Sequence, residues 1–346
     1  MTALPTRLAK PTRLGWWSVG VVTTLVAAAL VTGAVLGPAD IAVSHVLGEV
    51  LSRIPGLGIE SELTGIQQDI LWSWRFPRVV LGMIVGGTLA ISGAAYQGVF
   101  RNPLADPYLL GIAAGAALGA TLAIVSGLPA ALLVPSAFVG GVGAVAATFV
   151  LGRTMGDRSA TTLILAGVAM ASFLTALTTF VQQRNSESLR EIFAWILGRL
   201  STSGWTEVGL LAPYAAVSIV VMLGYRRTLD MLAVGDDEAA SLGVDVNRVR
   251  TVVVLAATAG TAAAVAASGL IAFVGIIVPH AVRLFVGTSY RVVLPLSLLS
   301  GAGFLVAADI AARSVMAPAE LPIGVVTSFF GAPFFVLVLR TSRRSL

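Results

Sequence analysis

The sequence predicts an all-α membrane protein, a bundle of ten transmembrane helices. Hydrophobic residues make up 57% of its 346 residues and charged residues only 11%. A soluble domain carries about 25% charged residues, so water could not solvate the surface of such a chain. Backbone polar groups in lipid must bond internally, and the apolar segments here have the length of spanning helices.

The first apolar segment, residues 16–37, follows a basic flank that contains Arg7, Lys10 and Arg13. It is longer than the apolar region of a signal peptide, which has about 7–15 residues, so we interpret it as an uncleaved span. Nine further segments of similar character follow, and ten spans place both termini on one side. The predicted spans are 16–37, 76–100, 108–127, 131–152, 161–183, 205–225, 251–268, 270–287, 292–312 and 321–340.

The arginines decide the orientation of this bundle. With ten spans, most of the 22 basic residues flank the ends on the side of the termini. Loops rich in Lys and Arg stay in the cytoplasm, so we expect cytoplasmic termini, with residues 1–15 as a cytoplasmic N-terminal flank. The polar segment 230–250 falls on the same side. No composition shift divides residues 1–346, which we interpret as one transmembrane domain.

Small residues recur every four positions within the spans, as Gly82 and Gly86 and as Gly111, Gly115 and Gly119. This spacing places them on one face of a helix, where they let two backbones approach closely. We therefore expect these glycines to be packing positions in a dense bundle.

The cytoplasmic segment reads DMLAVGDDEAASLGVDVNRVR and predicts a short helix between two spans. Asp236 and Asp237 could cap its start, and Glu238 suits the positive end of the helix dipole. Gly243 is a natural stop, and Asp245 could cap the next helix. The segment is either an ordinary solvated loop or a docking helix for a soluble partner.

Several classes of function lack the residues that they require. The chain has no cysteine, and it lacks the glycine-rich Gly-Lys-Ser/Thr motif of a phosphate-binding loop. Its arginines are scattered rather than striped, which disfavours nucleic acid. An ion-coupled carrier would depend on His280 or Asp309, which fall at opposite ends of the spans, and Asp309 could pair with Arg313. A membrane enzyme would need a catalytic constellation, which we do not find.

Long motifs give the chain a resemblance to a known family. Residues 75–111 read RFPRVVLGMIVGGTLAISGAAYQGVFRNPLADPYLLG, and residues 269–283 read GLIAFVGIIVPHAVR. With ELPIGVVTSFFGAP near the C-terminus and DEAASLGV in the cytoplasmic segment, they resemble the permease subunits of type II ABC importers, the FecCD family. The likeness extends from about residue 16 to residue 340.

The resemblance implies a single permease domain in the cytoplasmic (inner) membrane of a bacterium. It implies a dimer with an identical or paralogous second permease, and a pathway between the two copies. Two cytoplasmic ATPase subunits would bind ATP and Mg, while this chain would bind no cofactor or metal. A binding protein would deliver the cargo from outside: a ferric siderophore, or alternatively haem or cobalamin.

The resemblance also implies two sites. The family's coupling helix, which would dock on the ATPase, matches Glu238, Ala239, Ala240, Ser241, Leu242 and Gly243. The arginines that would pair with the binding protein match Arg75, Arg78 and Arg313; the alternative is that they snorkel to the lipid interface. The amphipathic segment 184–205 is either part of the same outer docking surface or an interfacial helix on lipid.

Overall fold

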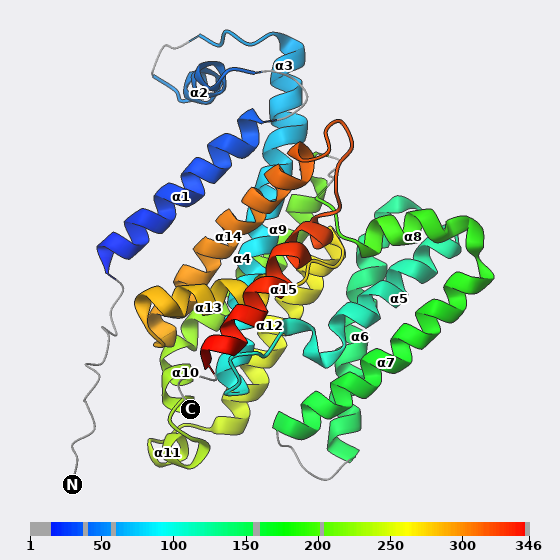
Figure 1. Cartoon of the computed structure of the whole chain (residues 1–346), viewed down its shortest axis with the longest axis vertical. Coiled ribbons are helices and arrows are strands. Elements are labelled where there is room, and N and C mark those ends of the chain that lie inside the picture. Colours follow the sequence, from blue (N-terminus) through cyan, green and yellow to red (C-terminus); the bar gives the residue numbers. More distant parts are fainter. Residues whose placement is uncertain (1–14, 37–40, 57–59, 155–159, 201–203, 343–346) are drawn as a thin grey trace.

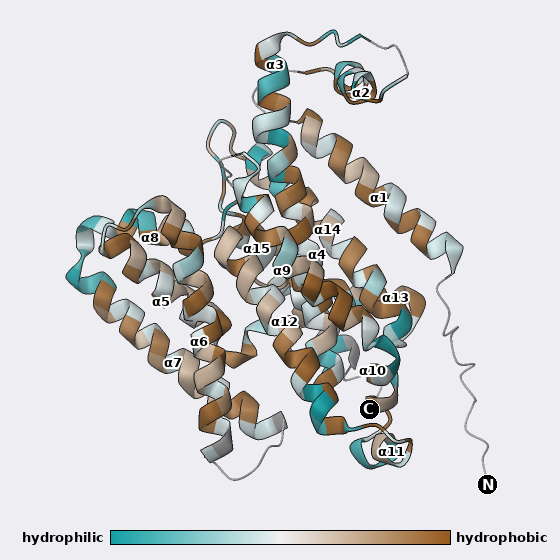
Figure 2. Ribbon diagram, turned by 180° about the vertical axis from the view of Figure 1, so that it is seen from behind, coloured by the Kyte–Doolittle hydropathy of each residue, from teal (hydrophilic) through white to brown (hydrophobic). Residues whose placement is uncertain are grey.

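The computed structural model describes residues 15–36, 41–56, 60–154, 160–200 and 204–342. The predicted N-terminal flank therefore lies outside the described residues, apart from Gly15. Every regular element in these ranges is a helix (Figure 1). Figure 2 shows apolar residues along the long helices and hydrophilic residues gathered toward the ends of the bundle, as in a membrane protein.

Seven helices are long and apolar enough to cross a membrane. Three shorter apolar helices accompany them. The seven are α1 (Trp16–Val35), α4 (Phe76–Val99), α6 (Leu133–Thr154), α7 (Ala160–Arg184), α9 (Thr206–Gly224), α12 (Val246–Ser268) and α14 (Tyr290–Ser314). The shorter ones are α5 (Ile112–Val125), α13 (Val274–Val286) and α15 (Ile323–Ser342), whose apolar part is Ile323–Leu337.

Short helices connect the long ones. At one end lie α2 (Val43–Ser52), α3 (Gly65–Ile70), the π-helical turn η1 (Leu71–Arg75) and α8 (Leu189–Ile196). At the other end lie α10 (Arg226–Leu232) and α11 (Asp236–Ser241). The 3₁₀ turns are η2 (Pro107–Leu110), η3 (Ala130–Leu132) and η4 (Ser186–Ser188).

Each predicted span coincides with a helix, and two of these helices start four residues later than predicted because the chain breaks before them. The predicted span 270–287 begins in a non-helical break, in which Gly269 has φ 71° and Phe273 has φ 70°, and α13 starts only at Val274. The predicted span 108–127 begins as η2, and Gly111 with φ 85° separates that turn from α5. Left-handed residues cannot continue a right-handed helix, so α5 and α13 are short.

Helix α4 is the central element, and nearly all of its residues are buried. It packs against α14 through glycines: a Cβ on Gly86 would lie 2.3 Å from the carbonyl oxygen of Gly301. Gly115 on α5 meets Gly140 on α6 in the same way, also at 2.3 Å. The predicted packing role of Gly86 and Gly115 is confirmed, whereas Gly111 serves a turn.

The segment 184–205 contains the predicted amphipathic helix as α8. Its Ile192 and Trp195 are buried, and Phe193 is 49% exposed. After α8, the backbone N–H of Arg199 donates to the carbonyl of Ser268 at 2.8 Å. These contacts seat α8 between α5 and the break that precedes α13, at the end of the bundle opposite α11. A partner for α8 at this end stays a prediction.

Candidate functional site

The predicted docking helix exists as α11 and projects from one end of the bundle (Figure 1). Gly235 is its N-cap, with no side-chain cap hydrogen bond, so the prediction that Asp236 and Asp237 cap its start is wrong. Both lie instead within the first turn, where their charges suit the helix dipole. Gly235 takes φ 155° and ψ 157°, a conformation open to glycine rather than to aspartate.

The end of α11 follows the prediction. Gly243 has φ 82°, and the N–H of Val244 returns to the carbonyl of Ala239 at 3.1 Å. This is the closure in which a left-handed glycine satisfies the last carbonyls of a helix. Asp245 then caps α12, since its carboxylate accepts from the N–H of Arg248 at 3.0 Å.

The six predicted coupling residues divide by exposure. Ala239 is fully buried and fixes α11 to the bundle. Leu242 is 62% exposed although it is a large apolar side chain. The exposed members of the predicted set are Glu238, Ala240, Ser241, Leu242 and Gly243. The helix therefore offers a small surface with one apolar side chain at its tip.

One carboxylate ties α11 to two long helices. Asp236 lies 3.1 Å from Arg250 at the start of α12 and 3.6 Å from Arg101 just beyond α4. Arg101 has φ 48°, a left-handed conformation that costs a residue with a Cβ about 1–2 kcal/mol. The sequence analysis missed this cluster, because no local pattern brings Arg101 and Asp236 together across the chain.

A second carboxylate anchors the preceding helix, α10. Asp230 accepts from the backbone N–H of Tyr290 at 2.5 Å and from the hydroxyl of Ser289 at 2.9 Å. It also lies 3.4 Å from Arg291. Asp230 thus caps the start of α14, so the segment that carries α11 is joined to α4, α12 and α14 by ionic and capping contacts.

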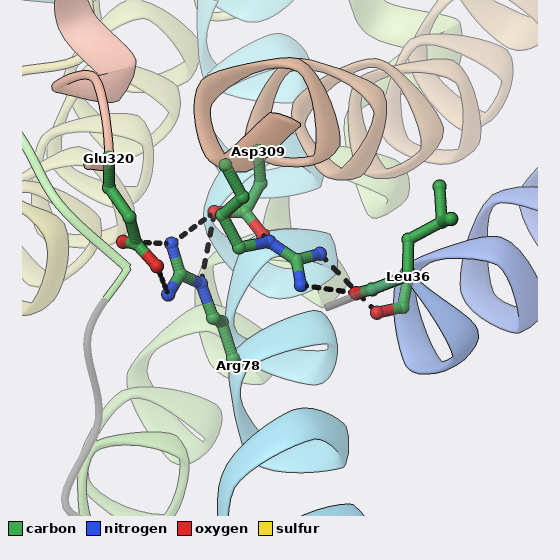
Figure 3. Close-up of polar contacts among 6 residues, drawn as sticks. Leu36, Arg78, Asp309 and Glu320 are labelled. Carbon is green, nitrogen blue, oxygen red and sulfur yellow. Dashed lines mark hydrogen bonds and ion pairs between the residues drawn. The ribbon is translucent and has the colours of Figure 1, made fainter. Parts of the chain in front are cut away.

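At the opposite end, charged residues surround Asp309, which is only 2% exposed. Arg78 bridges Asp309 and Glu320, at 2.9 Å and 2.8 Å (Figure 3). Nε of Arg313 lies 3.0 Å from the other carboxylate oxygen of Asp309, which confirms the predicted pair. Arg313 also donates to the carbonyl of Leu36 at 2.7 Å, at the end of α1.

Arg75 does not lie at the surface, where the sequence analysis placed it. It is 6% exposed and donates to the carbonyls of Ala34 and Val35 at 2.9 and 2.8 Å. The π-helical turn η1, which holds an extra residue per turn, turns Arg75 inward toward α1. The three predicted docking arginines therefore do lie at one end of the bundle. Arg75, however, lies beneath the surface and donates hydrogen bonds to the last carbonyls of α1.

The chain is similar in sequence to known membrane transport proteins. The model of the FecCD transport family matches residues 22–341. The chain belongs to the FecCD transport family. It is 44% identical to the cobalamin import system permease protein BtuC of Halobacterium salinarum, over 79% of this chain and 74% of that protein. It is 39% identical to the hemin transport system permease protein HmuU of Yersinia pestis, over 79% and 85%.

A solved structure shares the fold. It is assigned to the metal-chelate type of ABC transporter in an inward-facing conformation, and it superposes with a TM-score of 0.82 at 30% identity, over 94% of this chain and 99% of that one. The FecCD chain described here is therefore an all-helical, multi-pass permease of an ABC importer in the inner membrane. In this family ATPase and binding-protein subunits accompany the permease.

Proposed function

We propose that this FecCD permease carries a metal chelate inward in a complex with two ATPase subunits, a binding protein and a second permease that is identical or paralogous. The observation that carries the proposal is α11, a short capped helix that projects from one end with an exposed leucine at its tip. ATP and Mg would reside in the ATPase, and this chain would supply neither catalysis nor a cofactor site.

In this proposal the seven long and three shorter apolar helices form ten spans, and both termini are cytoplasmic. The arrangement supports this reading, because α1 begins and α15 ends toward the end at which α11 lies (Figure 1). That end would face the ATPase, and the end with α2, α3 and α8 would face the binding protein.

The ATPase would hold the helix through Glu238–Gly243. Leu242 would enter an apolar hollow on the ATPase, while the buried Ala239 keeps α11 attached. When ATP binding moves α11, the contacts of Asp236 with Arg101 and Arg250 would pass the displacement to α4 and α12. Ion pairs between packed helices are one kind of contact through which two distant sites can be coupled.

The binding protein would dock on Arg78 and Arg313, with Arg75 supporting them from beneath. Glu320 is half exposed, so an acidic group of the binding protein could replace it beside Arg78. Exposed ion pairs contribute about 0–1 kcal/mol each, so several would act together. Asp309 would remain with Arg313 and hold the end of α1 in place.

For the cargo we propose a ferric siderophore, with haem or cobalamin as the alternatives. The names of two relatives support the class, since both hemin and cobalamin hold a metal within an organic ligand. An ion-coupled carrier is less favoured, because Asp309 is engaged by two arginines at the outer end and is not placed for a relay with His280.

Reconstitution tests the proposal. We expect liposomes that hold the permease, its ATPase and its binding protein to accumulate the chelate only with ATP. Leu242→Glu should abolish stimulation of the ATPase by the binding protein, and Leu242→Met should retain it, while both variants remain folded in detergent. Accumulation by the permease alone, driven by an ion gradient and lost in His280→Ala, would replace the proposal with a secondary carrier.

A further inference from the structure

We propose that α2 lies in the outer interface of the bilayer and contacts lipid through an exposed apolar stripe. The stripe consists of Val43, Leu47 and Leu51 on α2 and Ile54 in the turn that follows. These side chains are 48%, 44%, 39% and 48% exposed. The inference concerns how the permease sits in the membrane, and it does not depend on the cargo or on the ATPase.

The rotation of α2 about its axis is fixed by a buried carboxylate. Glu49 is 1% exposed and accepts from the indole N–H of Trp72 at 2.8 Å, from Nε of Arg53 at 3.2 Å and from the hydroxyl of Ser61. Val46 is 2% exposed and packs in the apolar cluster at the end of α1. The face that carries Glu49 and Val46 therefore points at the protein, so the stripe cannot turn inward.

The remaining surface of α2 divides into two sectors. At about 100° per residue, Val43, Leu47 and Leu51 fall within about 80° of one another. The third sector, on the side of the stripe away from Glu49 and Val46, carries polar or small residues, namely Ser44, His45, Gly48 and Ser52. An amphipathic helix that borders protein, lipid and water in turn has this three-sector pattern.

The direction of α2 agrees with that position. Figures 1 and 2 show α2 end-on, whereas α4 runs along the long axis of the molecule. Because α4 crosses the membrane, α2 lies close to the membrane plane. Its place beside the C-terminal end of α1 is where the first span leaves the hydrocarbon layer.

An exposed apolar band on α1 continues toward the stripe. Val21 and Leu25 are 57% and 63% exposed along the span, and Leu36 at its end is 43% exposed. The described residues leave the stripe and this band exposed, although Val21 and Leu25 also border a hollow against Phe285 on α13. Figure 1 places α2 on the α1 side of the molecule, away from α8. Continuity with α1 thus favours lipid as the occupant, over a soluble partner or a second copy.

The test uses the absence of cysteine from the chain. Leu47→Cys places a reporter in the stripe, and Ser44→Cys places a matched one in the polar sector of the same helix. Each variant carries the environment-sensitive dye NBD on the full-length permease, in phosphatidylcholine–phosphatidylglycerol liposomes without binding protein. Leu51→Cys serves as a second stripe reporter should Leu47→Cys fail to fold.

We expect the stripe reporter to emit at shorter wavelength than the Ser44→Cys reporter. Lipids with a nitroxide high on the acyl chain should quench it several-fold more strongly, and aqueous iodide several-fold less. Equal quenching of the two reporters by iodide would overturn the proposal. Protection of the stripe reporter from both quenchers would also overturn the proposal, because it would show that protein covers the stripe. Protection in the permease alone would indicate a second copy of the chain, and protection only after the binding protein is added would indicate that protein.

Discussion

Asp309 shows how a buried charge is accommodated in this permease. The carboxylate lies between two arginines from α4 and α14, and one of these, Arg313, also holds the end of α1. In a medium of low dielectric constant such a group is tolerated only with partners on every side. The cluster therefore joins three helices at the end of the bundle opposite α11.

Removing this carboxylate should destabilise the bundle. We expect Asp309→Asn to lower the free energy of unfolding by about 3 kcal/mol, because two arginines lose their shared counter-ion in a largely buried place. Glu320→Gln is the matched control: it contacts the same Arg78 but is half exposed, and should cost at most about 1 kcal/mol. Thermal unfolding in detergent compares them, and equal shifts would contradict the structural role of Asp309.

Arg101 allows stability and coupling to be separated. Its φ of 48° suits glycine, so Arg101→Gly should stabilise the turn by up to about 1 kcal/mol. The same change removes the contact with Asp236, and we expect more ATP to be hydrolysed per cargo transported. Arg101→Lys, which keeps the charge, should lie between Arg101→Gly and the native chain. A normal ratio of ATP to cargo in Arg101→Gly would remove Arg101 from the coupling path.

At the scale of elements, close glycine contacts decide how the helices assemble. Lipid is as apolar as the helix surfaces, so close packing and not exclusion of water holds the bundle together. The contact of Gly86 with Gly301 fixes α4 against α14. The breaks before α5 and α13 have a different consequence, because they shorten two of the apolar helices within the bundle.

Adding one methyl group at this contact should separate the helices. We expect Gly86→Ala to cost about 1–3 kcal/mol, as overpacking does in well-packed cores. Gly143→Ala on α6 is the control: its Cβ would meet nothing within 4 Å, and alanine favours the helix by about 1 kcal/mol. The midpoint of thermal unfolding measures both, and equal midpoints would show that α4 and α14 separate easily.

At the scale of the whole molecule, the two ends differ in character. One end carries α11 with exposed charged and apolar groups, and the other carries α2, α3 and α8 (Figure 1). The second end also holds the ion pairs of Asp309 with Arg78 and Arg313. The long helices between them are predominantly apolar (Figure 2). This difference between the two ends suits a permease that would receive its cargo at one end and contact an ATPase at the other.

The orientation of the bundle in the membrane can be tested with single cysteines, because the chain has none of its own. We expect Ser241→Cys on α11 to react with a membrane-impermeant maleimide in inside-out vesicles only. Ser44→Cys on α2 should react in right-side-out vesicles only, because the two helices lie at opposite ends. Alkylation of both variants after detergent solubilisation is the control for reactivity. The reverse pattern would place α11 outside and exclude docking on a cytoplasmic ATPase.

The sequence by itself determined the helical class, the place of each long or shorter apolar helix to within a few residues, the C-terminal cap of α11 and the pairing of Asp309 with Arg313. These depend on composition and on neighbours along one helix, and the physical cause is local. Only the tertiary structure decided which arginines are surface groups. Arg75 and Arg78 are three residues apart, yet the first is buried against α1 and the second reaches Glu320. The contact of Asp236 with Arg101 joins residues distant in the chain, and no local pattern specifies which helices will meet.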